Sequence, residues 1–178
     1  MTGAPEQTVF RAVMSRWATG VTVVTTRDAE VDAGLTVNAF LSVSLSPPSV
    51  LVSLQDDVDT LPRLERSRAF AVSVLAADQQ AVSERFARTV PPEEKFRDLA
   101  FHRGTTGAAL IDGALGALEC RVLAITPAFD HRLVLGEVVA LEVGRDAPPL
   151  LFFRSGYGHA DGPETLRLPA PRHPPAPR

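Results

Sequence analysis

The strongest constraint on the fold is the stretch from Gly34 to Pro48, which runs directly into an apolar segment from Ser49 to Leu54. Small hydroxyl and amide side chains alternate here with apolar ones, at Thr36, Asn38, Ser42, Ser44, Ser46 and Ser53. Because successive side chains of an extended chain point to opposite faces, the alternation predicts a strand with a polar face and a core face. The polar face suits a polar, uncharged ligand, although such strands more often simply turn their serines and threonines to water.

The residues before this stretch predict a helix and a hairpin. Apolar side chains recur at helical spacing at Val9, Phe10, Val13, Met14 and Trp17. This spacing predicts an amphipathic helix, with Gly20 as its stop signal. The β-branched run 21–26 then predicts a buried strand, 27–30 a turn and 31–35 the returning strand of a hairpin.

Proline positions bound the elements that follow. Pro47–Pro48 cannot donate backbone hydrogen bonds, so this pair separates the alternating stretch from a strand over 50–54. An acidic segment comes next and leads into a short helix. Asp59 or Thr60 is expected to cap that helix, with Pro62 in its first turn.

The middle of the chain predicts one more strand, one more helix and a long loop. The strand covers 69–75, and the helix runs from 79 to about 87 with Asp78 as its cap. Residues 88–113 lack periodicity and are rich in proline and glycine, which predicts a loop. Loops of that length in compact domains are usually functional or disordered, and this one directly follows a helix end.

The C-terminal part predicts strands and then a tail. Two long strands cover 114–126 and 133–143, and a short one covers 150–154. After Gly162 the sequence is dominated by proline and arginine, so we expect a domain over 1–162 and a flexible tail over 163–178. Many strands with few helices predict a mainly β fold, an antiparallel barrel with short helices at its rim.

Length and charge exclude several classes of protein. The 178 residues, 45% of them hydrophobic, fit a single domain with a sizeable core. A formal net charge of -3 without a basic cluster argues against a nucleic-acid partner. No apolar run approaches the roughly 20 residues of a membrane helix, so we expect a soluble, cytoplasmic protein without a membrane partner.

The motifs of common enzyme classes are missing. There is no Gly-x-Gly-x-x-Gly after a strand, no phosphate-binding Gly-Lys-Ser/Thr loop and no Gly-x-Ser-x-Gly elbow. No histidine lies at ligand spacing with another histidine or cysteine, so no metal site is expected. The single cysteine, Cys120, shares a strand face with Leu118 and Val122 and is predicted to be a buried, inert thiol. If the protein is an enzyme, the remaining possibility is that a bound cofactor supplies the chemistry.

The amino-acid sequences of several segments resemble those of the short-chain flavin reductases. These blocks, in order along the chain, are Ala-Thr-Gly-Val-Thr-Val-Val-Thr-Thr at 18–26, Gly-Leu-Thr-Val-Asn-Ala-Phe at 34–40, Ser53-Leu54, Phe86-Ala87, Lys95-Phe96, Leu118-Glu119-Cys120, Asp130-His131, Gly136-Glu137-Val138 and Gly156-Tyr157. The resemblance implies an FMN-binding split barrel that works as a homodimer. It also implies reduction of FAD or FMN by NADH or NADPH, with reduced flavin supplied to a partner monooxygenase.

The resemblance further implies which residues bind the flavin. Those along the flavin ring would be Thr36, Val37, Asn38, Ala39 and Ser42. Those at the ribityl chain and phosphate would be Ser53, Leu54, Asp57, Val58, Asp59 and Thr60, joined by Phe86, Ala87 and Arg88. The start of the short helix favours a phosphate electrostatically, and Arg88 is the expected cation that offsets the nearby aspartates.

His131 and Tyr157 would lie on the nicotinamide side. His131 would orient the nicotinamide without acting as an acid or base, because hydride transfer to a flavin needs no protein proton carrier. On position alone, His131 is a turn residue and Tyr157 a core residue. One departure concerns Phe129, where the family usually has glycine. A positive φ strains phenylalanine, so the turn is expected to differ or Phe129 to cover the ring.

Two other functions remain open at this stage. Related split barrels bind flavin or haem without turnover, so a non-catalytic module is the main alternative. An enzyme similar to pyridoxamine phosphate oxidase would need a basic phosphate pocket. That reading is disfavoured because Lys95 is the only lysine among 18 basic residues.

Overall fold

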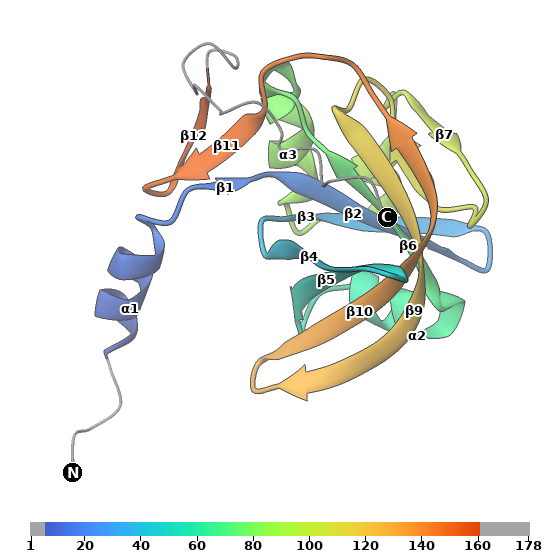
Figure 1. Cartoon of the computed structure of the whole chain (residues 1–178), viewed down its shortest axis with the longest axis horizontal. Coiled ribbons are helices and arrows are strands. Elements are labelled where there is room, and N and C mark those ends of the chain that lie inside the picture. Colours follow the sequence, from blue (N-terminus) through green and yellow to red (C-terminus); the bar gives the residue numbers. More distant parts are fainter. Residues whose placement is uncertain (1–5, 161–178) are drawn as a thin grey trace, which may run out of the picture.

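The computed structural model describes residues 6–160, and its centre is an antiparallel sheet of seven strands (Figure 1). Their order across the sheet is β3-β2-β6-β9-β10-β5-β4. The bounds are Thr22–Asp28 for β2, Val31–Val37 for β3, Phe40–Leu45 for β4, Pro48–Gln55 for β5, Ala69–Val74 for β6, Gly116–Ala128 for β9 and His131–Val143 for β10. The sheet curls into a barrel, which confirms the predicted mainly β fold.

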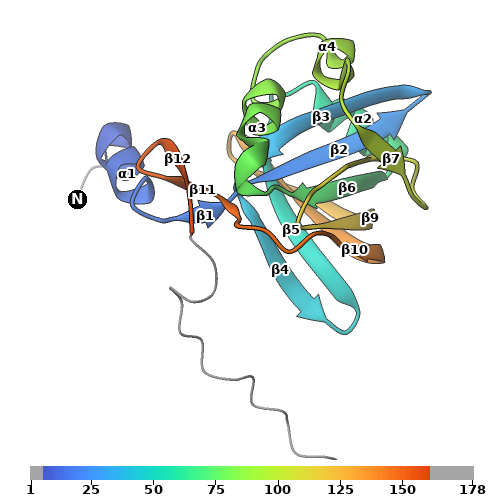
Figure 2. The same cartoon turned by 90° about the horizontal axis from the view of Figure 1, so that it is seen from above.

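Two small sheets and the helices complete the fold. The small sheets are β1 (Thr19–Gly20), β11 (Leu150–Phe153) and β12 (Gly156–His159), and separately β7 (Phe101–Arg103) with β8 (Ala109–Ile111). The helices are α1 (Gln7–Met14), α2 (Thr60–Ser67), the 3-10 turn η1 (Ala77–Gln79), α3 (Gln80–Phe86) and α4 (Pro92–Phe96). Figure 2 shows α3 and α4 on the side of β2 and β3, against which they pack. None of the helices within residues 6–160 could cross a bilayer.

Strand β2 is buried on both faces, which explains its β-branched run. Val24 belongs to the cluster inside the barrel, together with Phe70 and Val134. Val23 points the other way, into a second cluster that Phe86 of α3 helps to close. Strands covered on both faces carry side chains that can be buried on either side, so this run does not alternate. Its buried threonines donate their hydroxyls to backbone carbonyls, as Thr25 does to Ala109 at 2.6 Å.

Helix α1 stands apart from the barrel (Figure 1). It forms where the apolar spacing predicts a helix, yet none of its residues is buried. Trp17, which lies beyond its end, is 70% exposed. Gly20, predicted to stop the helix, instead lies in β1 and pairs with Leu151. An isolated helix of eight residues is marginally stable in water, so α1 needs a packing surface that one copy of the chain does not give it.

Three sequence predictions of local structure are wrong. Residues 88–113 contain α4, β7 and β8 instead of a continuous loop, and Ala109 is fully buried. Asp78 does not cap α3, because its carboxylate is paired with Arg145. Asp59 is the first residue before α2, but its side chain makes no capping hydrogen bond.

Strand β4 also departs from its predicted pattern. Its alternation was expected to turn apolar side chains to the core, but Leu41, Val43 and Leu45 are exposed. The pairing with β5 shifts between Ser42 and Ser44, as at a β-bulge. As the outermost strand of the sheet, β4 has only one neighbour, so its apolar side chains are left uncovered.

The predicted tail over 163–178 and the domain end at 162 lie outside the described residues. Cys120 is fully buried in the barrel core beside Phe70 and Val122. Burial raises the pKa of its thiol to about 12, so the inert thiol predicted from the sequence is confirmed.

Candidate functional site

One cavity collects most of the residues predicted to hold the ribityl chain and phosphate. It measures about 270 Å³ and lies at the start of α2, facing the end of α3. We call it the helix-start cavity. Its walls include seven predicted residues: Asp57, Val58, Asp59, Thr60, Phe86, Ala87 and Arg88. They come from two segments about 25 residues apart, so the fold has brought them together.

The helix-start cavity contains charges of both signs. Asp57 and Asp59 line it, and Arg88 and Lys95 stand among them. The Lys95 ammonium donates to the carbonyl oxygens of Gly34, at 3.0 Å, and Phe86, at 3.3 Å. Desolvation lowers the pKa of Lys95, and the charge of Asp59 works against that change. The two cations therefore offset the two aspartates, so the charged side chains of the wall sum to about zero.

Close packing between β3 and α3 fixes one wall of this cavity. A Cβ atom at Gly34 would come within 2.9 Å of both the Phe86 ring and the Val24 carbonyl oxygen. The Phe86 ring also meets Phe96 of α4 edge to face, with centroids 5.1 Å apart. Only glycine lets Phe86 approach so closely, and that approach places the end of α3 at the cavity.

A second cavity adjoins the first and is lined mainly by apolar side chains. It measures about 190 Å³, and we call it the tyrosine cavity. Its walls are Val21, Thr36, Asn38, Ala87, Phe152 and Tyr157. Ala87 belongs to both cavities, so they meet at the end of α3. Two residues predicted for the flavin ring and one predicted for the nicotinamide thus share one site.

Hydrogen bonds fix the polar groups of the tyrosine cavity. The Thr36 hydroxyl donates to the Ser83 carbonyl oxygen at 2.6 Å. The Tyr157 hydroxyl lies 2.8 Å from Ser83 Oγ, and its ring meets Phe152 edge to face. Asn38 is exposed, and its side-chain amide has no hydrogen-bond partner within residues 6–160. The amide is therefore the group on this wall that remains available to a ligand.

The other predicted ring and ribityl residues line neither cavity. Val37 and Leu54 point into the barrel core. Ala39 accepts a hydrogen bond from the Ser53 backbone N–H at 3.0 Å, which ties the two segments together near the site. Ser42 is exposed on β4. The structure therefore places these residues around the site but brings none of their side chains into it.

His131 lies at the rim of this region. It begins β10 and pairs through its backbone with Gln55, which lines the helix-start cavity. Its Nδ1 atom is 2.8 Å from the Asp130 carboxylate. Phe129, in the same turn, keeps the positive φ of 60° that a glycine would adopt, and its side chain is fully exposed. The phenylalanine thus adopts the left-handed conformation that glycine favours, and it covers nothing in this chain.

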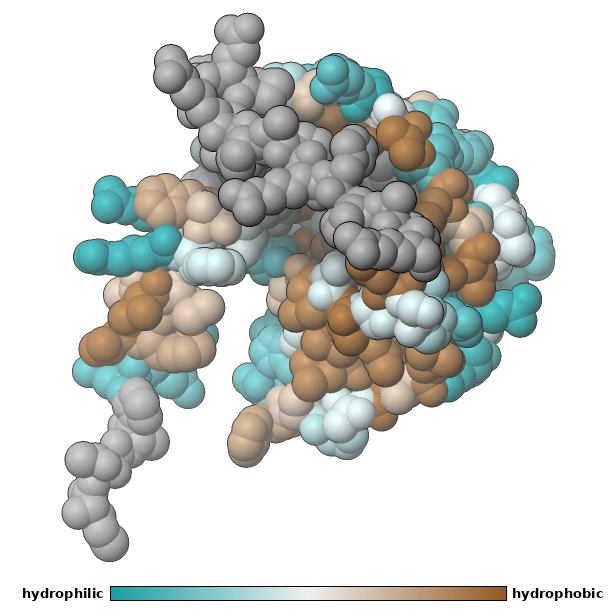
Figure 3. Space-filling view, in the orientation of Figure 1, coloured by the Kyte–Doolittle hydropathy of each residue, from teal (hydrophilic) through white to brown (hydrophobic). Residues whose placement is uncertain are grey.

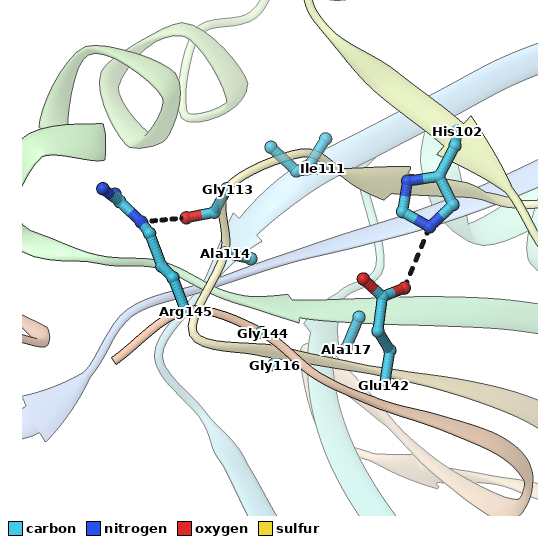
Figure 4. Close-up of a pocket in the computed structure, with 9 residues that line it drawn as sticks. All are labelled: His102, Ile111, Gly113, Ala114, Gly116, Ala117, Glu142, Gly144 and Arg145. Atoms are coloured by element: carbon cyan, nitrogen blue, oxygen red, sulfur yellow. Dashed lines mark hydrogen bonds and ion pairs between the residues drawn. The ribbon is translucent and has the colours of Figure 1, made fainter. Parts of the chain in front are cut away.

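A third cavity lies away from every predicted site residue (Figure 4). It measures about 150 Å³. Its polar side chains are already engaged: His102 bonds Glu142 at 2.9 Å, and Arg145 donates to the Gly113 carbonyl oxygen at 2.6 Å. Such a set leaves little for a ligand to bind, and the two adjoining cavities are the better candidate site.

Lys95 and Phe152 are cavity residues that the sequence analysis left without a role. Lys95 did carry a signal, because a single lysine in an arginine-rich chain marks a position where a compact ammonium fits better. Its two carbonyl acceptors lie on separate segments, and the sequence gives no sign of that geometry. Phe152 lies in a short strand that reads as core, and only the pairing with β12 puts it beside Tyr157.

Comparison with known proteins places this fold and site in a family. A model described as "Flavin reductase like domain" matches residues 14–161. The reductase component of 4-hydroxyphenylacetate 3-monooxygenase from Thermus thermophilus is 42% identical over 148 residues, which cover 83% of this chain and 93% of that protein. FMN reductase (NADH) SmoA from Agrobacterium fabrum is 38% identical, covering 88% and 87%.

A solved structure agrees with these relatives. The Streptomyces globisporus NADH:FAD oxidoreductase SgcE6, in complex with NAD and FAD fragments, matches with a TM-score of 0.81 and 34% identity, covering 89% of this chain and 94% of that one. The fold and its relatives define an oxidoreductase of the flavin reductase type. The chain belongs to the flavin reductase-like domain family, which confirms the resemblance found in its motifs.

Proposed function

We propose that this chain is an NAD(P)H:flavin oxidoreductase that reduces FAD or FMN and releases the reduced flavin to a partner monooxygenase. The observation that carries the proposal is the pair of adjoining cavities, which meet at Ala87 and contain residues from both sets predicted for the flavin. Relatives named as FMN reductase (NADH) and as a monooxygenase reductase component support the enzyme over a non-catalytic module.

The residues present fit a flavin nucleotide. Arg88 and Lys95 give the helix-start cavity the cations that a phosphate requires, beside the start of α2. The tyrosine cavity offers aromatic walls and the uncommitted amide of Asn38, which suit a flat ring with a polar edge. We therefore assign the phosphate to the helix-start cavity and the ring, with the nicotinamide, to the tyrosine cavity.

The chemistry of the reaction comes from the flavin and nicotinamide, and the protein binds and orients them. Reduction leaves negative charge at the pyrimidine edge of the ring, so a neutral donor such as the Asn38 amide stabilises the product. The Thr36 hydroxyl is already donated to Ser83, so we assign Thr36 a contact through its backbone or methyl group. His131, at the rim, orients the nicotinamide.

The central test is a steady-state assay that crosses NADH and NADPH with FAD and FMN. We expect nicotinamide oxidation that depends on added flavin, with a preference for one flavin and one nicotinamide. Oxidation that stays at background whatever flavin is added would reject the enzyme. A flavin affinity without turnover would then identify a non-catalytic binding module.

Two aspartate variants test where the ring lies. In Asn38→Asp, a negative charge replaces the amide, so the flavin KM should rise by about fivefold or more, the equivalent of one lost hydrogen bond. Ser42→Asp adds the same charge on β4, outside both cavities, and should raise the flavin KM less. A larger effect at Ser42 would place the ring along β4 instead.

An orienting role of His131 and a purely structural role predict different effects of the same substitution. Removing an orienting group should slow single-turnover flavin reduction, since a displacement of about one ångström can cost on the order of a hundredfold. His131→Ala should therefore reduce flavin slowly while keeping its flavin affinity and melting temperature. A normal rate with a lowered melting temperature would identify a turn residue only.

We further propose that the chain forms a homodimer through its uncovered apolar surface. Leu45 of β4 and Leu141 and Val143 of β10 are exposed, and α1 exposes its own apolar side chains. Figure 3 shows an apolar area on one face of the barrel. Patches of this extent on soluble proteins usually mark interfaces. A second copy offers the same apolar surface in return, and reduction of flavin by nicotinamide fits the cytoplasmic location expected above.

Light scattering on the purified chain tests the dimer. The mass should be twice that of one chain, and Leu141→Asp should shift it toward the monomer. Val31→Asp places the same charge on an exposed residue of β3 and should leave the mass unchanged. A monomeric parent chain would reject the proposed dimer.

A further inference from the structure

Ser83 contacts three walls of the tyrosine cavity without lining the cavity itself. It lies on α3 and is fully buried. Its Oγ atom is 2.8 Å from the Tyr157 hydroxyl, and its carbonyl oxygen accepts the Thr36 hydroxyl at 2.6 Å. The same carbonyl accepts the Ala87 backbone N–H at 3.0 Å. Thr36, Ala87 and Tyr157 are half of the residues that form the cavity.

These three residues come from parts of the chain that are otherwise weakly connected near the cavity. Thr36 is on β3, Ala87 follows α3, and Tyr157 is on β12. Strand β12 has four residues and sits at the edge of its sheet, paired only with β11. The Ser83–Tyr157 hydrogen bond joins this edge strand to α3 through side chains. Ser83 therefore holds the hydroxyl end of Tyr157, while Phe152 packs against its ring.

A second buried serine shows what a purely structural role looks like. Ser73 on β6 is as fully buried as Ser83, and its Oγ accepts the Ile111 backbone N–H at 3.0 Å. Both residues belong to the fold's hydrogen-bond network, but the partner of the Ser73 hydroxyl, Ile111, lines neither the tyrosine cavity nor the helix-start cavity. Loss of either hydroxyl should cost similar stability, because each removes one buried hydrogen bond.

We propose that Ser83 is a positioning residue for the nicotinamide, acting through the Tyr157 hydroxyl. This inference rests on the proposed function, since it assumes that the nicotinamide enters the tyrosine cavity. Ser83 holds Tyr157 against the end of α3, and its carbonyl holds Thr36 on the opposite wall. The cavity is thereby preorganised, and preorganised sites bind without first ordering their own side chains.

The kinetic test uses Ser83→Ala, Tyr157→Phe and the double variant. Ser83→Ala keeps the carbonyl contacts and removes only the hydroxyl, so the nicotinamide KM should rise by about fivefold while the flavin affinity stays the same. If Ser83 acts through Tyr157, the double variant should be no worse than the more impaired single variant. Ser73→Ala should lower the melting temperature similarly and leave the nicotinamide KM unchanged.

A spectroscopic test needs neither cofactor nor activity. Tyr157 is the only tyrosine in the chain, so carbon-13 at its ring ζ position gives one NMR signal. Ser83→Ala should move that signal, and Ser73→Ala should not. Tyr157→Phe breaks the same hydrogen bond from its half-buried end and keeps the kinetic test available if Ser83→Ala does not fold.

The two proposals fail in different ways. Nicotinamide affinity is to be measured by calorimetry as well as by KM, so an inactive parent chain would reject the proposed enzyme but leave the Ser83 comparison intact. Additive effects in the double variant, an unmoved Tyr157 signal, or a nicotinamide affinity equal in Ser83→Ala and Ser73→Ala would each overturn the positioning role.

Discussion

Two charged side chains hold opposite ends of the segment 88–113, and they do so in opposite ways. Lys95 lies on the segment itself, in α4, and donates to carbonyl oxygens of β3 and α3. Glu119 lies outside the segment, on β9, and accepts hydrogen bonds from it. Its carboxylate accepts the backbone N–H groups of Thr105 at 2.8 Å and Thr106 at 2.5 Å, and the Thr106 hydroxyl at 2.6 Å.

The two sites differ in what is left over for a ligand. Glu119 is 4% exposed, and its carboxylate accepts from three donors of the fold. An ammonium has three protons, and Lys95 donates two of them within the chain, so one remains for a ligand at the helix-start cavity that Lys95 lines. A buried charge whose partners come from the fold acts as an anchor, whereas an ammonium with one proton left over at a cavity wall also serves a ligand.

Glu119→Ala should have the largest effect on stability. Burial works to raise the pKa of Glu119, but hydrogen bonds from Thr106 and Thr105 outweigh it and hold the pKa below its usual value. Removing the carboxylate takes three hydrogen bonds to a buried charge away from Thr105 and Thr106, at a cost of about 3 kcal/mol. We expect a melting temperature lower by roughly 10 °C and unchanged kinetic constants for the folded protein.

Protonation of Glu119 at low pH should lower the stability of the chain, as Glu119→Ala does. The pKa of Glu119 is lower in the folded chain than in the unfolded chain. Its contribution to stability is therefore present at pH values above its unfolded pKa, and it is lost as the pH falls through its folded pKa. Glu137→Ala, on the neighbouring β10, is the control, since that half-buried carboxylate receives no hydrogen bond within residues 6–160. Equal losses in the two variants would mean that the Glu119 contacts contribute nothing specific.

The sequence predicted the sheet well and this segment poorly, for a physical reason. The β2–β3 hairpin and the long strands β9 and β10 have continuous periodic patterns that follow from local sequence. Strands β7 and β8 have three residues each, too few to show a period. They are held by long-range contacts such as the Ile111 N–H to Ser73, which a local pattern cannot reveal.

The candidate site was predictable to the extent that motifs carry it. Phe86 and Ala87 stand in a family block, the resemblance implied Thr60 and Arg88, and the structure brings all four to one cavity. Ser83 and the carbonyl contacts of Lys95 were not predicted, because the sequence does not show which groups a helical serine or a single lysine will meet after folding. The sequence therefore indicates which segments form the site, and packing decides which side chains enter it.

Lys95→Met should have a smaller effect on stability than Glu119→Ala and a larger one on binding. Methionine keeps the length of the side chain, so the loss is two hydrogen bonds from a half-buried ammonium, about 1 to 2 kcal/mol. The cavity also loses a cation, so the flavin KM should rise by about tenfold. A thermal melt and steady-state kinetics together measure both effects.

Arg97→Met is the matched control for charge, because Arg97 is exposed just beyond α4 and lines neither cavity. It should change neither the melting temperature nor the flavin KM appreciably. A Lys95→Met variant that loses stability but keeps its flavin KM would make Lys95 an anchor like Glu119. That result would remove the difference between the two ends of the segment.

The smallest expected effect comes from His102, which ties the Glu119 end of the segment to the sheet. Its Nδ1 atom lies 2.7 Å from the Asp112 carboxylate, and its Nε2 atom lies 2.9 Å from the Glu142 carboxylate. The charge of His102 also contributes to lowering the pKa of Glu119. The hydrogen bonds that the ring donates to the carboxylates of Asp112 and Glu142 raise the pKa of His102 above 6.5, outweighing a small desolvation effect. The imidazolium is thus favoured in the folded chain.

The sign of the pH dependence follows from that shift. A group whose pKa is raised on folding stabilises the folded chain fully at pH values below its pKa in the unfolded chain. The contribution of His102 to stability is therefore present below about pH 6.5, and it is lost as the pH rises through the pKa of His102 in the folded chain. The side chain is 45% exposed, so solvent screening limits the effect to a few tenths of a kcal/mol, about 1 °C in melting temperature. The measurement is the difference in melting temperature between the parent chain and His102→Gln, followed from pH 5.5 to about pH 8.5, because subtraction removes the titration of other groups. We expect that difference to shrink as the pH rises. A difference that grows instead would show that His102 is held neutral between its two carboxylates, and that the Glu119 end of the segment is fixed by Glu119 alone.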